Sequence, residues 1–138
     1  MWKNIEYFSV AVNNLEEGMK LYQSLFDLKP AGPVKDDKRM GFRSVVLGNG
    51  ERPFVEIIEP ADPGSALARY MKGRARPDNP HGEGLYLVGV EVDDLDKTVR
   101  RIRRQGGKVT QQGDIPGIAW VHPLSARHAF IELRQSKA

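Results

Sequence analysis

The sequence of 138 residues contains no cysteine, which excludes disulfide bonds, thiolate catalysis and zinc sites built on thiolates. No hydrophobic run approaches the roughly 20 residues that a membrane-spanning helix needs, and the first residues lead into a strand pattern rather than a signal peptide. Aromatic residues make up only 8% of the chain and do not interleave with its two basic runs, residues 72–76 and 100–104, as nucleic-acid binding would require. We therefore expect a cytoplasmic protein that binds neither membranes nor nucleic acid.

What the chain does contain is typical of one folded domain spanning residues 1–138. Hydrophobic residues make up 40% and charged residues 28%, which argues against disorder. The net charge is only +3, and the basic run 100–104 alternates around Ile102 as a solvated helix face does. The run 72–76 is compatible with a small ligand that carries phosphate, such as a coenzyme A ester.

The clearest feature is an internal repeat. Residues 10–15 read Val-Ala-Val-Asn-Asn-Leu and residues 90–95 read Val-Glu-Val-Asp-Asp-Leu, each an apolar strand, two capping residues and the start of an amphipathic helix. Each half also ends in a strand with one glutamate among apolar residues, at 54–58 and 130–133. The repeat predicts an α+β fold of tandem βαβββ modules, residues 1–60 and 84–134, joined by a linker, residues 61–83, with a short helix.

Within this plan the hydrophobic spacing places the individual elements. It predicts strands over 5–12, 41–47, 53–59 and 85–92, helices over 15–28 and 95–105, a short linker helix from Ser65, and three short strands ending at 133. Because strand neighbours point to opposite faces, the aliphatic residues beside Glu56 and Glu132 should pack under the helices. Both glutamates would then point into one incomplete barrel-like cavity, where a buried carboxylate needs a metal, a hydrogen-bond donor or its own proton.

These stretches resemble the vicinal oxygen chelate superfamily, which includes glyoxalase I, ring-cleaving dioxygenases, bleomycin and fosfomycin resistance proteins and methylmalonyl-CoA epimerase. The likeness covers almost the whole chain and is closest to the epimerase-like branch, whose strand His-Ile-Gly-Ile-Ala-Val corresponds to residues 7–12, Tyr-Phe-Ser-Val-Ala-Val. The other matching stretches are the helix at 65–74, Gly-Leu-Tyr-Leu-Val at 84–88, Glu-Val-Asp-Asp at 91–94, and His-Pro at 122–123 through Ile-Glu-Leu at 131–133. The resemblance implies a glyoxalase-like fold.

The resemblance also implies a divalent metal held by a histidine, a glutamine or glutamate, a second histidine and a glutamate. The corresponding positions here are Tyr7, Glu56, Leu87 and Glu132, so both histidines are replaced. Leucine cannot ligate, and neutral tyrosine is a poor ligand for a hard divalent ion. We therefore expect no metal site and no cofactor.

The remaining polar residues of the expected cavity suit proton transfer. Two carboxylates in one partly apolar cavity push each other's pKa values apart, which leaves one as base and one as acid near neutral pH. This favours metal-free proton transfer next to a carbonyl, in an isomerisation, epimerisation, dehydration or cyclisation, with a tyrosine hydroxyl donating to the enolate oxygen. The candidate catalytic residues are Tyr7, Glu56 and Glu132. The candidate substrate-binding residues are Arg43, Leu87, Trp120 and His128. We expect His128 to begin the final strand, where its even spacing from Glu132 would place both side chains on the same face.

Three functions stay open at this point. The first is a metal-independent isomerase or lyase acting on a small carbonyl or thioester compound. The strand at 41–47 has Arg43 and Ser44 but no acid where the resemblance places a second catalytic carboxylate, which argues against methylmalonyl-CoA epimerase activity itself. The second is a ligand-sequestering protein of the drug-resistance type, and the third is a metal enzyme with rearranged ligands, such as His128 joining the two glutamates. A homodimer is expected, because one pair of modules leaves strand edges unpaired.

Overall fold

The structure, a computed structural model, describes residues 1–137. In that range it has three α-helices and a mixed sheet of nine strands that is not closed. None of the helices in the described range is both long and apolar enough to cross a membrane. The chain forms two compact units, which we name by their helices: the α3 unit, Met1–Tyr7 with the chain from Leu87 on, and the α1–α2 unit, Phe8–Tyr86. Strands β1 (Trp2–Ala11) and β6 (Gly84–Val92) each run through both units.

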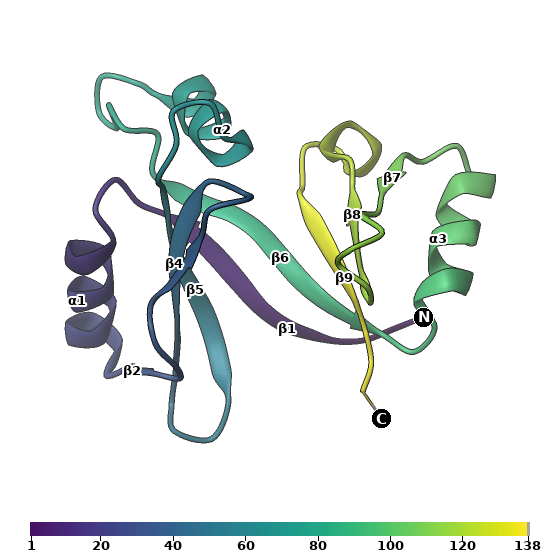
Figure 1. Ribbon diagram of the computed structural model, residues 1–138, viewed down its shortest axis with the longest axis horizontal. Helices are drawn as coiled ribbons and strands as arrows, with labels where there is room; N and C mark the ends of the chain where they lie inside the picture. Colours follow the sequence, from purple (N-terminus) through teal and green to yellow (C-terminus); the bar gives the residue numbers. More distant parts are fainter. Residues whose placement is uncertain (138) are drawn as a thin grey trace. The chain divides into compact units, whose positions relative to one another are not determined.

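In the α1–α2 unit the strand order is β2-β4-β5-β1, and β3 pairs with β4. These strands are β2 (Lys29–Pro30), β3 (Lys35–Asp37), β4 (Phe42–Gly48) and β5 (Pro53–Pro60). Helix α1 (Leu15–Phe26) begins where the Asn14 side chain accepts a hydrogen bond from the backbone of Glu17, and it lies along β4 and β5 (Figure 1). β1 and β5 are parallel, with Ser9 opposite Glu56.

Two apolar clusters hold this unit together. The larger one packs beneath α1 and contains Val10, Val12, Leu15, Val45, Leu47, Val55 and Ile57. The smaller one packs beneath α2 (Ala66–Arg74) and contains Ala11, Ile58, Leu67 and Met71. Because Val55 and Ile57 face α1, Glu56 between them points to the opposite face of β5, as the alternation predicts.

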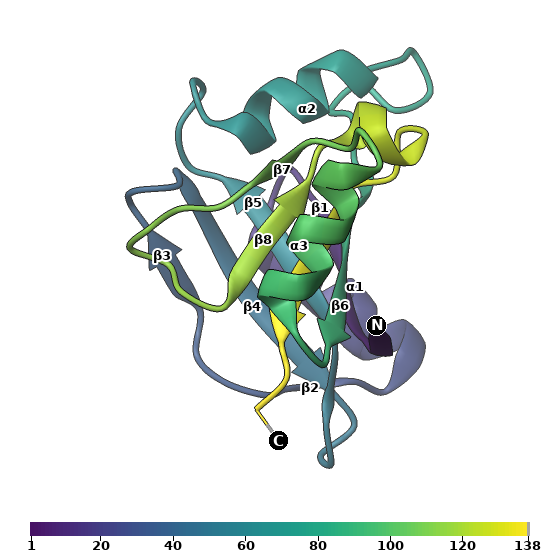
Figure 2. The same cartoon turned by 90° about the vertical axis from the view of Figure 1, so that its right-hand side faces the viewer.

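In the α3 unit the strand order is β1-β6-β9-β8-β7, with β7 (Val109–Thr110), β8 (Ile118–Val121) and β9 (Ile131–Gln135). Helix α3 (Leu95–Arg104) starts at Asp94, whose carboxylate accepts from the Lys97 backbone, and it lies across the face of β8 and β9 (Figure 2). The core beneath it contains Val90, Val92, Leu95, Val99, Ala119, Val121 and Leu133. Glu132 therefore points away from α3.

The structure confirms the α+β fold of tandem βαβββ modules, and the ends of the predicted helices and longer strands agree within three residues. The short strands β2 and β3 are additional. Their residues show no apolar alternation, and both are strands only because they pair with β4.

The prediction that His128 begins the last strand was wrong. A 3₁₀ turn (Pro123–Ala126) is followed by Arg127 and His128 with positive φ angles of 55° and 74°. The His128 backbone donates to the carbonyl of Pro123 at 2.7 Å, which closes this turn, and β9 begins only at Ile131. The exposed His128 side chain thus has no strand alternation that would place it on the face of Glu132.

Candidate functional site

Glu132 of β9 is the centre of the strongest candidate site. Its side chain is buried, with 6% of the residue exposed, although it points away from the apolar core beneath α3. Its paired neighbours in the sheet are Gly89 on β6 and Trp120 on β8. The Tyr7 hydroxyl of β1 donates a hydrogen bond to its Oε2. The two predicted catalytic residues of the α3 unit are thus in direct contact.

Gly89 makes this contact possible. A Cβ at position 89 would lie 2.2 Å from Cε1 of Tyr7, so only glycine leaves room for the Tyr7 ring to pass over β6 and reach β9. We did not identify Gly89 from the sequence. Its signal was a glycine inside an apolar strand, which often marks the close approach of another group.

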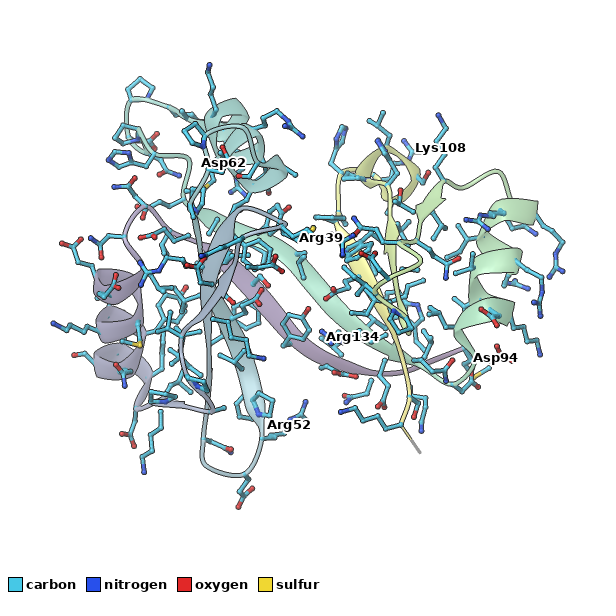
Figure 3. The ribbon with its side chains drawn as sticks, in the orientation of Figure 1. Arg39, Arg52, Asp62, Asp94, Lys108 and Arg134 are labelled. Carbon is cyan, nitrogen blue, oxygen red and sulfur yellow. The ribbon has the colours of Figure 1, made fainter. Side chains whose placement is uncertain are left out.

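Arg134 is the second residue that our sequence analysis missed. It lies two positions beyond Glu132 on the same face of β9 and is labelled in Figure 3. Its Nη1 donates to the Tyr7 hydroxyl oxygen at 3.3 Å and lies 3.6 Å from Oε2 of Glu132, while its guanidinium carbon lies 5.6 Å from the centre of the Tyr7 ring. Arg134, Tyr7 and Glu132 therefore form one connected cluster of polar groups.

The electrostatics of this cluster favour a carboxyl that can change its protonation state. Burial raises the pKa of the Glu132 carboxyl above its usual value of 4.5, because water no longer solvates the charged form. The positive charge of Arg134 partly opposes this rise in pKa, and the negative charge of Glu6 adds to it. A carboxyl with a raised pKa can accept a proton and return it at a pH closer to neutral.

Glu56 belongs to the α1–α2 unit and has its own surroundings there. Its Oε1 accepts a hydrogen bond from the Ser9 hydroxyl at 2.5 Å, and Val46 of β4 lies opposite it in the sheet. In the same unit, burial above all, and then the charges of Tyr70 and Glu56, raise the pKa of Tyr86 to about 12, so this phenol stays neutral. Glu56 and Glu132 lie in different units, and their convergence on one cavity stays a prediction from the sequence.

Three of the predicted substrate-binding residues, Leu87, Trp120 and His128, belong to the α3 unit. Leu87 is buried and lies two residues before Gly89, on the same face of β6, and Trp120 is partly buried beside Glu132. These two side chains give the cluster apolar neighbours. His128 lies exposed in its turn.

Arg43 makes its contacts on the side of the sheet that α1 covers. It donates to Glu59 at 3.1 Å and to Glu16 of α1 at 2.7 Å, and Glu59 in turn accepts from the backbone of Leu15 at 2.8 Å. Arg43 thus ties strands β4 and β5 to the start of α1. The structure does not bring it to Glu56, which points to the opposite face.

The donor set at the four positions of the resemblance does not fit a divalent metal. The Tyr7 hydroxyl is engaged with Glu132, and the Leu87 side chain has no donor atom. Across residues 1–137, no three histidine, aspartate or glutamate side chains come close enough together to hold a metal ion. A rearranged site in which His128 joins Glu56 and Glu132 would combine residues of both units and stays an alternative from the sequence.

Comparison with known proteins identifies the class of protein that carries this site. A sequence model of the Glyoxalase/Bleomycin resistance protein/Dioxygenase superfamily matches residues 8–120, and the chain therefore belongs to this superfamily. This confirms the resemblance that the sequence motifs indicated.

Methylmalonyl-CoA epimerases are among the most similar relatives. The chain is similar to the mitochondrial methylmalonyl-CoA epimerase of Dictyostelium discoideum, with 24% identity over 136 residues that span 95% of this chain and 77% of the relative. The crystal structure of the Mycobacterium tuberculosis methylmalonyl-CoA epimerase matches with a TM-score of 0.80 and 21% identity, covering 99% of this chain and 90% of the other. A variant of the Streptomyces coelicolor methylmalonyl-CoA epimerase, in complex with 2-nitronate-propionyl-CoA, matches with a TM-score of 0.80 and 19% identity over the whole of both chains. At these identities the structural matches show the glyoxalase-like fold alone.

Proposed function

We propose that the protein is an isomerase or lyase that transfers a proton next to the carbonyl group of a small carbonyl or thioester compound, without a metal. The observation that carries this proposal is the buried Glu132 carboxyl, held by the Tyr7 hydroxyl and with its pKa raised by burial. A group of this kind is suited to take a weakly acidic proton and to return it.

In the proposed reaction, the bond between the substrate carbon and its hydrogen breaks, and the proton moves to the Glu132 carboxylate. The electron pair of that bond moves toward the carbonyl and leaves a negative charge on its oxygen as an enolate. Among residues 1–137, the hydrogen bond from Tyr7 and the ion pair with Arg134 both involve Oε2 of Glu132, so we assign Oε1 to the substrate proton. When the substrate has a β,γ double bond, the enolate is conjugated with it, and return of the proton to the γ-carbon isomerises the substrate. When the β-carbon carries a leaving group, its loss from the enolate, with formation of an α,β double bond, gives a lyase reaction.

Epimerisation would require one further group. A proton must then reach the reacting carbon from the side opposite to Glu132, and Glu56 is the residue that the sequence predicts for this role. Ser9 donates to Glu56 and would hold its carboxylate in one orientation. The involvement of Glu56 is a separate part of the proposal and has its own test.

The relatives supply the first substrates to try. The similar proteins are methylmalonyl-CoA epimerases, and one of them was solved with a propionyl-CoA nitronate. Acyl-CoA thioesters are therefore the substrate class that we propose. Since β4 carries Arg43 and Ser44 and no acid at those positions, the panel should extend beyond methylmalonyl-CoA to propionyl-CoA and other 2-substituted acyl-CoA thioesters.

The test is exchange of the substrate α-proton in D₂O, followed by proton NMR. Glu132→Gln should lower the exchange rate by ~10²–10⁴, the usual contribution of a positioned general base. Tyr7→Phe should lower it less, because the carboxyl remains. Glu56→Gln should reduce epimerisation more than exchange, and Glu51→Gln, at an exposed turn residue, is the control.

Two results would overturn the proposal. One is unchanged exchange in the Glu132→Gln variant. The other is tight binding of a thioester by the wild-type protein without any exchange, which would favour the ligand-sequestering function.

A further inference from the structure

We infer that Arg134 is the cationic group of this site, and that its guanidinium receives the negatively charged oxygen formed when the substrate loses its proton. The inference rests on the proposed function, since it concerns the oxygen of the same reaction. It assigns to Arg134 the role that the sequence suggested for the Tyr7 hydroxyl.

The first step of the argument is the hydrogen-bond direction at Tyr7. A tyrosine hydroxyl has one proton, and in this structure Tyr7 donates it to Glu132. The hydroxyl oxygen accepts from Nη1 of Arg134 at 3.3 Å. While this arrangement holds, Tyr7 has no proton left to donate to a substrate oxygen. Another donor must stabilise the enolate.

The second step is the position of the Arg134 guanidinium. It lies over the Tyr7 ring, with 5.6 Å between the guanidinium carbon and the ring centre, and Nη1 lies 3.6 Å from Oε2 of Glu132. These contacts fix the cation beside the carboxyl that accepts the proton. A substrate carbon that gives its proton to this carboxyl would therefore have its carbonyl oxygen within reach of a positive charge.

The third step is the set of donors that remains. A guanidinium carries five N–H donors, and within residues 1–137 the polar contacts of the Arg134 side chain go through Nη1, beside its stacking on the Tyr7 ring. The Arg134 side chain is 38% exposed, so its guanidinium is fixed in position and still accessible from solvent. The other donors are therefore free to point at a ligand that enters from solvent.

The fourth step concerns the charges around Arg134. In the sheet, Glu91 of β6 lies opposite Arg134, and Glu132 forms an ion pair with it. When Glu132 takes up the substrate proton it becomes neutral, and the guanidinium loses the charge of that partner at the moment the enolate forms. Leu87 and Trp120, the apolar neighbours of the cluster, strengthen the interaction because they exclude water.

The experiment measures the preference of the protein for an enolate mimic. The probes are the nitronate of 2-nitropropionyl-CoA, which carries negative charge where the enolate does, and propionyl-CoA, which does not. Calorimetry gives both dissociation constants for the wild-type protein and for the Arg134→Gln and Arg134→Lys variants. Arg100→Gln, at an exposed arginine of α3, is the matched control.

We expect Arg134→Gln to lose the preference for the nitronate by ~10²–10³, the usual effect of removing one donor to an oxyanion. Propionyl-CoA binding should stay within a few-fold of wild type, Arg134→Lys should keep part of the preference because it keeps a charge, and Arg100→Gln should match wild type. With a thioester that exchanges, Arg134→Gln should lower kcat far more than it raises KM. If the role of Arg134 were merely structural, Arg134→Gln would raise the dissociation constants of both ligands by a similar factor.

The outcomes distinguish a failure of this inference from a failure of the proposed function on which it rests. If Glu132→Gln loses exchange while Arg134→Gln keeps the full nitronate preference, the inference is wrong and the proposed function stands. If Glu132→Gln exchanges normally, the proposed function is wrong and so is the inference. A wild-type protein that binds both probes equally, or neither, also overturns the inference.

Discussion

The substitution Glu132→Gln should make the protein more stable at neutral pH while removing its proposed activity. In the folded protein, burial raises the pKa of this carboxyl above the 4.5 of an exposed glutamate. Between these two pKa values the folded state binds more protons than the unfolded state, so the free energy of unfolding falls as the pH rises. Above the raised pKa the full cost of the buried charge is present. Glutamine removes that cost and still accepts the hydrogen bond from Tyr7.

The size of the effect follows from the pKa difference. Each unit by which the folded pKa exceeds the unfolded pKa corresponds to ~1.4 kcal/mol of unfolding free energy at neutral pH. For a chain of this size, 1 kcal/mol shifts the Tm by about 4 °C. Every unit of raised pKa should therefore appear as a gain of several degrees in the variant.

The assay is thermal unfolding followed by circular dichroism between pH 4 and pH 8. The Tm of Glu132→Gln should exceed that of wild type at pH 7. The difference should shrink toward pH 4, where the wild-type carboxyl is mostly protonated in both the folded and the unfolded protein. Glu51→Gln, at an exposed position, should follow wild type throughout. A Glu132→Gln variant that is less stable than wild type at pH 7 would refute the reasoning, because Arg134 and Tyr7 would then outweigh burial.

Three further predictions follow from the same contacts. Gly89→Ala places a methyl group 2.2 Å from the Tyr7 ring, so it should lower the free energy of unfolding in urea by about 1–3 kcal/mol. It should also lower the α-proton exchange rate at least as far as Tyr7→Phe does. Gly113→Ala, which has open space around it, should change neither quantity. Arg43→Gln should lower the free energy of unfolding only slightly, because it removes two ion pairs that solvent screens, and should leave α-proton exchange unchanged; loss of exchange would contradict its placement on the α1 side. Light scattering should give twice the chain mass of 15.5 kDa if the unpaired strand edges are covered in a homodimer, and a monomer at micromolar concentration would contradict this.

The faces of the strands could be predicted from the sequence because alternation is a local property. Apolar residues on both sides of Glu132 are enough to turn its carboxylate away from the helix, and the contact with Tyr7 follows once both residues lie on the same face. The same alternation also places Gly89 and Arg134 on this face. We missed them because the search was for acids and histidines, while the site also depends on a space for the Tyr7 ring and on a cation.

Other features depend on pairing that no local pattern contains. Arg43 meets Glu59 because β4 aligns with β5 so that the two residues lie opposite each other, and this register is a property of the folded sheet. The even spacing between His128 and Glu132 has meaning only along a continuous strand. Two consecutive residues with positive φ interrupt that strand, and since neither of them is glycine, the sequence carries no signal for this turn.

The most direct test of the account is the rate of α-proton exchange in protein dialysed against EDTA, measured for wild type and Glu132→Gln side by side. The account predicts that the chelator leaves the wild-type rate unchanged and that the wild-type protein exceeds Glu132→Gln by ~10²–10⁴. Exchange that disappears from the wild-type protein on chelation and returns with added divalent metal would contradict it.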